Sequence, residues 1–180
     1  MKKTLIASLI ALTTGLAFAG NYFSVDVDSV KDSVTKAKNT AQYIRVGKDI
    51  GTVNFDLQVR TAVLEKGGML NSLEATAGKN LGHINVFAGL GHDNGFNGAR
   101  NGSYEYGLVG ASTGIAFGPV YTYAGAKTRV NWETSAPKQT VVFAGASYPL
   151  TKTVSANAGW SKSLQNIKED ALGLGIRVNF

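Results

Sequence analysis

Apolar and polar side chains alternate along most of the chain after residue 20. In the clearest run, residues 52–65, the odd-numbered positions from 53 to 63 are apolar or Thr, and the even-numbered positions carry mainly amide or charged side chains. The end of the chain is as regular, with apolar side chains at Leu172, Leu174, Ile176, Val178 and Phe180. Side chains two positions apart share one face of a strand, whereas a helix repeats every 3.6 residues. The pattern therefore predicts β-strands that are apolar on one face.

Ten segments show this alternation. Their ranges are 22–28, 41–48, 52–65, 70–78, 82–90, 104–117, 120–132, 139–148, 154–161 and 172–180. The connections are alternately short (48–51, 78–80, 118–119 and 149–152) and longer (29–39, 65–69, 92–103, 133–138 and 164–169). This is typical of an up-and-down transmembrane barrel, with the short turns and both termini on the periplasmic side. We expect an all-β, closed, antiparallel barrel of ten strands; eight remains the alternative if 22–28 or 139–148 is not a strand.

A soluble β-sandwich would also alternate, but its outer face would carry many charges. Here the polar faces are instead rich in Gly, Ser, Asn and Tyr, and small inward residues allow a narrow barrel to close. Aromatic residues lie near the predicted strand ends, as in the interfacial girdles of membrane barrels. They are Phe23, Tyr104, Phe117, Trp132, Tyr148, Trp160 and Phe180. The membrane barrel is therefore the favoured architecture.

Composition narrows the possible chemistry. Charged residues make up 17% of the 180 positions, below the roughly 25% that is usual. The chain has no Cys and two His, which excludes disulfides, thiolate metal sites and thiol nucleophiles. We expect no metal and no cofactor. The net charge is +6, but the sequence shows no surface that combines basic and aromatic residues, so we expect no nucleic-acid partner.

The first 19 residues have the three parts of a secretory signal. Lys2 and Lys3 precede an apolar stretch over residues 5–16, and small residues at Ala17 and Ala19 mark a cleavage site. We therefore divide the chain into a signal peptide, 1–19, and an outer-membrane β-barrel, 20–180. The expected location is the cell outer membrane, reached through the periplasm.

The ending LGLGIRVNF, with Phe180 as its terminal aromatic residue, resembles the C-terminal assembly signal of bacterial outer-membrane barrels. With the signal peptide and the alternation over 20–180, the chain resembles the small outer-membrane barrels, a group that includes the opacity proteins and the transmembrane domain of outer-membrane protein A. The resemblance implies insertion by the barrel-assembly machinery through the C-terminal strand. It also implies contact with outer-membrane lipid and lipopolysaccharide. The best-known members have eight strands, whereas ten are counted here.

The predicted inward faces carry charge. Basic side chains at Arg45, Arg60, Lys127, Arg129 and Arg177 face carboxylates at Asp26, Asp56 and Glu74. These charges either pair across a narrow lumen as a plug or line a water path that prefers small anionic solutes, because rings of Arg or Lys favour anions. We therefore expect a small porin-like passive channel or a structural barrel.

The sequence allows two other classes of function. Surface recognition would act through the predicted extracellular loops 29–39 and 92–103, the first of which carries lysines that suit lipopolysaccharide phosphates or host polyanions. A hydrolase would use His92, Asp93 and Ser103, but adjacent residues in an Asn- and Gly-rich loop point apart, and no orienting group is visible. We expect no enzymatic activity and no catalytic residues. His83 is expected to fill the lumen.

Overall fold

The computed structural model describes residues 22–32, 36–63, 69–97, 100–132, 139–164 and 169–180; the predicted signal peptide, 1–19, lies outside them. The described residues form ten strands. They are β1 (Tyr22–Asp32), β2 (Lys38–Ile50), β3 (Val53–Val63), β4 (Met69–Leu81), β5 (Ile84–Asn97), β6 (Arg100–Phe117), β7 (Val120–Asn131), β8 (Gln139–Pro149), β9 (Val154–Ser163) and β10 (Glu169–Asn179). The prediction of ten strands is confirmed, and the alternative of eight is wrong.

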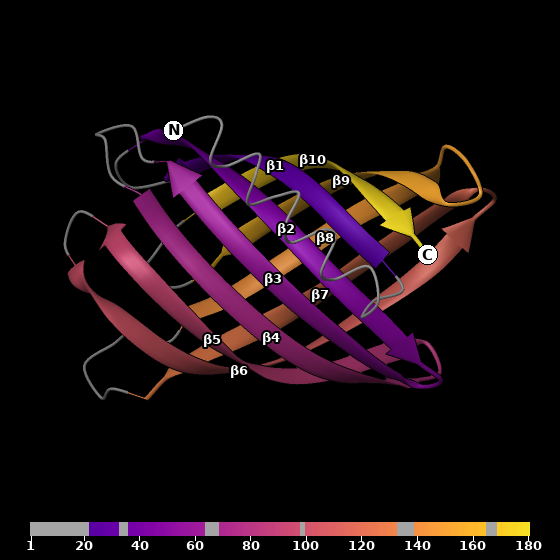
Figure 1. The fold of residues 1–180 in the computed structure, drawn as a ribbon, viewed down its shortest axis with the longest axis horizontal. Coiled ribbons are helices and arrows are strands. Elements are labelled where there is room, and N and C mark those ends of the chain that lie inside the picture. The colour runs from indigo at the N-terminus through magenta and orange to yellow at the C-terminus, as the bar shows by residue number, and fades with distance from the viewer. Residues whose placement is uncertain (1–21, 33–35, 64–68, 98–99, 133–138, 165–168) are drawn as a thin grey trace.

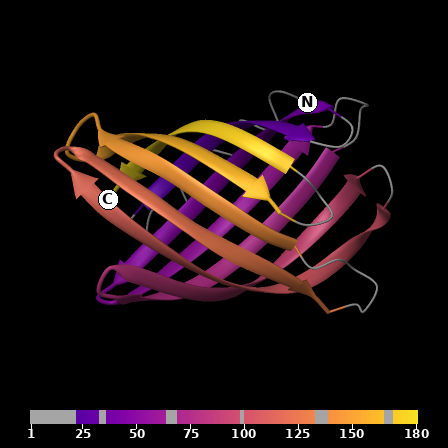
Figure 2. The same cartoon turned by 180° about the vertical axis from the view of Figure 1, so that it is seen from behind.

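Each strand pairs antiparallel with its neighbours in the chain, and the first strand pairs with the last. At this seam Tyr22 lies opposite Asn179, and Asp32 lies opposite Glu169. The sheet is therefore a closed up-and-down barrel, as predicted, and its ladder has no open edge (Figure 1 and Figure 2). Within the described residues, no helix is long and apolar enough to cross a membrane.

Four short turns lie at one end of the barrel, on the right in Figure 1, together with the C-terminus. Three of them place a glycine at positive φ: Gly51 (64°), Gly82 (75°) and Gly118 (58°). Glycine as the first of two turn residues, with positive φ at that position, is the requirement of a type II′ hairpin. The predicted turn at 78–80 is wrong, because β4 continues to Leu81 and Gly82 supplies the turn.

Strands at the opposite, long-connection end extend further than the sequence predicted. β5 runs to Asn97 and β6 begins at Arg100, so the predicted loop 92–103 is mostly a continued hairpin. Likewise, β1 and β2 take up much of the predicted loop 29–39, since they reach Asp32 and start again at Lys38. Cross-strand pairing in the ladder outweighs the low strand propensity of Asn and Gly in these segments.

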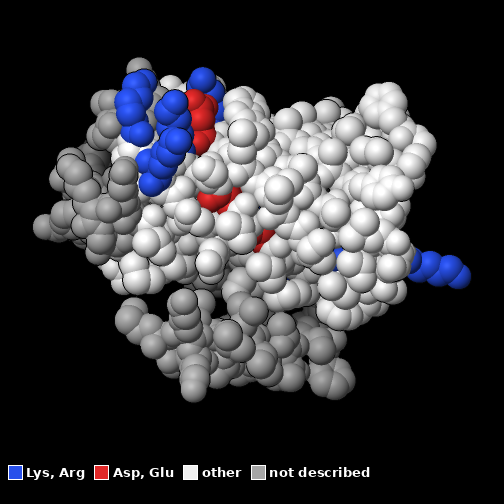
Figure 3. Space-filling view, turned by 90° about the horizontal axis from the view of Figure 1, so that it is seen from above, with Lys and Arg blue, Asp and Glu red and all other residues white. Residues whose placement is uncertain are grey.

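The outer wall is apolar and exposed. Leu90, Val109, Leu172 and Leu174 are among the most exposed side chains on it. Five of the predicted girdle aromatics are also exposed: Phe117, Trp132, Tyr148, Trp160 and Phe180. Tyr104 was wrongly placed among them, because its hydroxyl donates to the buried Asp93 at 2.9 Å. Figure 3 shows a largely uncharged face with basic side chains gathered at one end and another basic side chain protruding at the opposite end.

Inside the barrel, large side chains lie over glycines of neighbouring strands. A Cβ built on Gly91 would be 2.2 Å from the Tyr106 ring, and one on Gly145 would be 2.4 Å from the Tyr123 hydroxyl. A Cβ on Gly173 would be 2.0 Å from an Asp28 carboxylate oxygen. The inward glycines therefore provide the space into which inward rings and carboxylates fold, which lets bulky polar groups fit a narrow bore.

Gly91→Ala should destabilise the barrel by about 1–3 kcal/mol, the usual cost of overpacking, because the new methyl group collides with the buried Tyr106 ring. The matched control is Gly107→Ala on β6, where the nearest atom, Trp132 Nε1, is at an ordinary 3.5 Å. Urea unfolding of both variants in lipid vesicles, followed by tryptophan fluorescence, measures the difference. Equal stability of the two variants would contradict the proposed packing.

Candidate functional site: the charged interior

The seven predicted interior residues all line one cavity of about 670 Å³ inside the barrel. They are Arg45, Asp56, Arg60, Glu74, Lys127, Arg129 and Arg177. Alternation on five strands, β2, β3, β4, β7 and β10, brings them to the same enclosed space. Their contacts divide them into two groups, one toward each end of the barrel.

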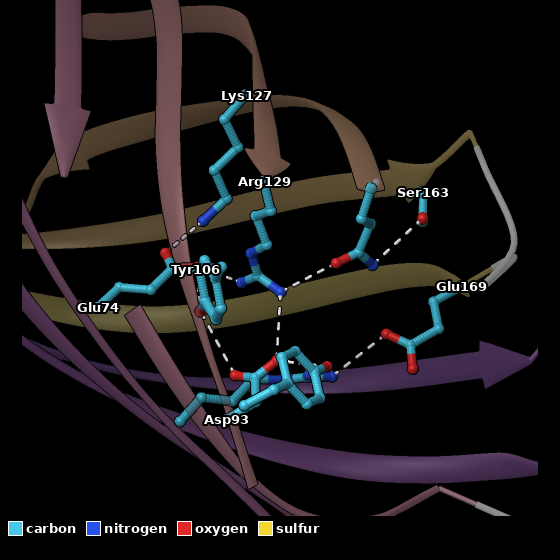
Figure 4. A network of polar contacts seen from close by, with 10 residues as sticks. Glu74, Asp93, Tyr106, Lys127, Arg129, Ser163 and Glu169 are labelled. Atoms are coloured by element: carbon cyan, nitrogen blue, oxygen red, sulfur yellow. Dashed lines mark hydrogen bonds and ion pairs between the residues drawn. The ribbon is translucent and has the colours of Figure 1, made fainter. Parts of the chain in front are cut away.

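The first group centres on Glu74, whose side chain is only 4% exposed (Figure 4). Lys127 Nζ and Arg129 Nη2 both donate to this carboxylate, one to each oxygen. The Tyr106 hydroxyl lies 3.0 Å from Glu74 Oε1 and 3.3 Å from Asp93 Oδ1. Arg129 also stacks over the Tyr106 ring at 4.9 Å. We call these five residues the Glu74 network; it joins β4, β5, β6 and β7.

Further contacts carry this polar layer across the bore. Arg129 Nη1 donates to Gln139 Oε1 at 3.0 Å, and Gln139 Nε2 donates to Ser163 Oγ at 3.3 Å. On the other side, Arg60 pairs with Glu169 at 3.4 Å. Glu169 is the first residue of β10 and Arg129 is two residues from the end of β7, so the layer lies toward the long-connection end.

The second group surrounds Tyr22 near the short-turn end. The Tyr22 hydroxyl donates to Asp56 Oδ2, and the Arg177 guanidinium lies 3.5 Å from the Tyr22 ring centre. Arg45 Nε lies 4.0 Å from Asp26 Oδ2. A cation over an aromatic face is stabilised by the ring quadrupole. Each basic residue of this group therefore has a carboxylate or a ring beside it.

The expected surplus of basic charge in the lumen is wrong. Asp28, Asp49 and Glu169 also line the cavity, and Asp93 is buried in the Glu74 network. With Asp26, Asp56 and Glu74, these carboxylates outnumber the five basic side chains among the described inward residues. Asp28 continues the even-numbered inward face of the first predicted strand, and so was available from the pattern. Asp93 is absent from the predicted interior residues because it lies in the segment 92–103, which the sequence predicts to be a loop.

The histidine and serine considered for catalysis lie on the outer wall. His92 and Asp93 point to opposite faces of β5: Asp93 is buried inside, whereas His92 Nε2 lies 2.9 Å from Ser103 Oγ. His83 does not fill the lumen, because it is exposed in the turn after β4. In the part of the chain that the structure describes, no cluster of three or more His, Cys, Asp or Glu could hold a metal ion.

A closed antiparallel barrel with an apolar outer wall and a polar, charged interior has the architecture of bacterial outer-membrane β-barrels. No protein-family model matches the sequence, and no curated protein matches it. Solved structures similar to this chain include bacterial outer-membrane barrels and designed transmembrane β-barrels.

The translocator domain of the autotransporter NalP from Neisseria meningitidis has a TM-score of 0.54 and 13% identity, and the match covers 99% of this chain and 96% of that one. The beta domain of the Bordetella autotransporter BrkA has a TM-score of 0.52 and 11% identity, covering 89% and 99%. Neisserial surface protein A has a TM-score of 0.48 and 19% identity, covering 88% and 96%. At 13% and 11% identity, the likeness to the two autotransporter domains shows the fold alone.

Glu74→Gln should destabilise the barrel by about 3–5 kcal/mol, because it leaves Lys127 and Arg129 buried side by side without their shared carboxylate. Glu105→Gln, on the exposed outer face of β6, should change the free energy of unfolding by less than about 0.5 kcal/mol. Adding Lys127→Met to Glu74→Gln should restore part of the loss. A Glu74→Gln barrel as stable as the Glu105→Gln control in urea would show that the network does not stabilise the fold.

Proposed function

We propose that this chain is an integral outer-membrane β-barrel whose interior forms a narrow, passive polar path. The cavity of about 670 Å³, enclosed by the ten strands and lined by charged and hydroxyl side chains, is the observation that carries the proposal. A small barrel is nearly filled by its own side chains, so any path through it is narrow. Small hydrophilic solutes and ions are the class of substrate that fits.

In this proposal, the Glu74 network forms the narrowest part of the path. Its buried side chains reach inward from four strands, and the bonds through Gln139 to Ser163 extend the layer toward the opposite wall. Because these groups are held together by hydrogen bonds and ion pairs, moving them aside for a solute costs free energy. We therefore expect conductance to be small in the unmodified barrel.

The ion preference proposed differs from the one expected from the sequence. Carboxylates are at least as numerous as basic groups along the described cavity wall, so the basis for an anion preference is lost. Rings of carboxylates favour cations, as rings of Arg or Lys favour anions. We therefore propose that the path has either no ion preference or a weak preference for cations.

Location and assembly belong to the same proposal. Export directed by residues 1–19 and insertion through β10 would place the barrel in the outer membrane of a bacterium. Phe180, which follows β10 and is 67% exposed, is positioned for recognition by an assembly machinery. Recognition through the segments 29–39 and 92–103 is the weaker candidate, since much of both segments is strand.

Removing the Glu74 network should increase the conductance of the barrel several-fold. The test is the triple variant Glu74→Ala, Lys127→Ala and Arg129→Ala, which removes the carboxylate together with both of its cations. Asp93 loses Arg129, 3.9 Å away, and keeps the Tyr104 and Tyr106 hydroxyls. Single-channel recording in planar bilayers under a salt gradient gives both the conductance and the ion preference. Lys48→Ala, on the exposed outer wall, is the control and should leave both unchanged.

Two results would count against this proposal. A folded barrel that conducts no ions, either unmodified or as the triple variant, would leave a purely structural role. A clear anion preference of the unmodified barrel would contradict the charge balance seen in the cavity. Heat-modifiable electrophoretic migration of each sample first establishes that the barrel has formed.

A further inference from the structure

A serine and a histidine meet on the outer wall at the long-connection end of the barrel. Ser103 on β6 and His92 on β5 come from paired strands, and Ser103 Oγ lies 2.9 Å from His92 Nε2. The Ser103 side chain is exposed, so a substrate can reach it. A serine hydroxyl within hydrogen-bond reach of an imidazole is the arrangement that activates serine as a nucleophile, because the ring nitrogen takes the hydroxyl proton as Oγ attacks.

Strand pairing supplies a carboxylate that the linear sequence does not show. Asp93, next to the histidine in the chain, is buried inside the barrel, but Glu105 lies directly opposite His92 on the outer face. Opposite residues in an antiparallel pair have Cβ atoms about 4.5–5.5 Å apart, so the Glu105 carboxylate can reach Nδ1 of the ring while Nε2 faces Ser103. These two side chains, both in the described part of the chain, are not bonded to each other. A rotation of the Glu105 side chain completes the arrangement, as contacts of this kind often tighten only when substrate binds.

Amide groups lie beside the serine on the same face. Asn94 is exposed and lies directly opposite Ser103, so its Nδ2 group is a donor for an oxyanion formed at that serine. On the next strand, Asn71 lies opposite Asn94. The Thr61 hydroxyl donates to Asn71 Oδ1 at 3.0 Å, which leaves the amide hydrogens of Asn71 for other acceptors. The nucleophile, its base, a carboxylate and amide donors therefore share one patch of the outer wall.

A notch in the apolar wall begins next to this patch. Gly107, two residues along β6 from Glu105, is the one glycine among the outward positions of the described strands. It lies between Leu90 and Val130, which are 58% and 41% exposed. Among the described residues, a Cβ built on Gly107 would meet only Trp132 Nε1, at 3.5 Å. Since β5 and β7 are roughly 10 Å apart across β6, the gap over Gly107 has room for one alkyl chain.

We propose that this patch hydrolyses carboxylic esters of apolar acyl chains, with Ser103 as the nucleophile and His92 as the general base. The Ser103 proton passes to His92 Nε2 as Oγ attacks the ester carbonyl carbon, and the Asn94 amide stabilises the oxyanion. The bond to the alcohol oxygen breaks as His92 gives this proton to the leaving alcohol. Water then attacks the acyl-serine and gives a proton to His92. The carboxylic acid leaves as His92 returns the proton to Ser103 Oγ.

The surroundings define the kind of ester and the role of each neighbour. The acyl chain lies in the notch over Gly107, and the alcohol part points toward the polar end of the wall. Gly107 lies further along β6 than Ser103, so a long acyl chain bound at the serine reaches the notch and an acetyl group does not. Glu105 is a positioning residue, because it fixes the ring of His92 and does not touch the ester. The site is on the outer wall and does not depend on a path through the interior.

The test is ester hydrolysis by the folded barrel in a non-ionic detergent. The probes are p-nitrophenyl palmitate in mixed micelles and the soluble p-nitrophenyl acetate. Ser103→Ala should abolish turnover of both, and His92→Gln should lower kcat by about 10²–10⁴-fold, the usual contribution of a general base. The matched controls are Thr40→Ala, an exposed outward hydroxyl on β2, and His83→Gln, an exposed histidine in the turn after β4. Both controls should leave turnover unchanged.

Two further variants separate positioning from binding. Glu105→Gln should lower kcat for both esters by at least about tenfold and leave KM unchanged, because it affects the orientation of the base and not the contacts of the substrate. Gly107→Val fills the notch, so it should raise KM for the palmitate ester by about tenfold or more and leave the acetate ester unchanged. A residue with only a structural role would not produce this division between kcat and KM.

A fluorophosphonate probe tests the nucleophile directly, since a serine oxygen bonds to its phosphorus with loss of fluoride. Peptide mass spectrometry should find the adduct on Ser103 of the unmodified barrel. Absence of the adduct, or turnover by Ser103→Ala equal to that of the unmodified barrel, would overturn the inference. Equal effects of Gly107→Val on the two esters would overturn the assignment of the acyl chain to the notch. Heat-modifiable migration first shows that each variant has folded, and a folded barrel that conducts no ions would leave this site standing.

Discussion

The structure depends on the pairing of β1 with β10. Backbone N–H and C=O groups that lose water need a partner, and an open sheet always leaves two edges without one. Register between Tyr22 and Asn179 at one end and Asp32 and Glu169 at the other closes the ladder along the whole of β1. Closure then forces alternate side chains into a bore of fixed width. The limited width of the bore explains the small inward residues, because each large inward side chain needs a glycine beside it on a neighbouring strand.

The same closure decides how charge is held inside. A buried charge is costly unless other groups satisfy it. Glu74 meets two cations and a tyrosine hydroxyl, while Arg177 lies on the Tyr22 ring. Aromatic rings serve two purposes here: they fill the space over glycines, and they provide a polarised surface for guanidinium groups. Many interior charges are therefore held against opposite charges or aromatic rings, which explains why the interior can be highly charged in a chain with a low overall share of charged residues.

Much of the fold could be predicted from the sequence, because alternation at a period of two is a local property. The faces of β3, β7 and β10 and the number of strands were fixed by it. The ends of the strands could not be predicted in this way, since they depend on cross-strand pairing. The run from His92 to Asn97 has a composition that disfavours a strand, but it pairs with β4 and β6. The same error hid Asp93 and reversed the facing of Tyr104. Which inward charges meet was also beyond the pattern, because contacts such as Arg60 with Glu169 depend on the closure and register of the whole barrel.

The positive net charge of the chain, +6, takes on a different meaning once each face is known. The predicted inward faces suggested that part of this positive charge lies in the lumen. The described inward residues instead carry a slight excess of carboxylates, so positive charge in excess of negative lies elsewhere. On the described strands, the outer wall carries more basic than acidic residues: Lys31, Lys38, Lys48, Lys79 and Lys162 against Glu105 and Asp170. Charges on the inner wall are compensated by protein groups at fixed distances, whereas those on the outer wall face lipid and water.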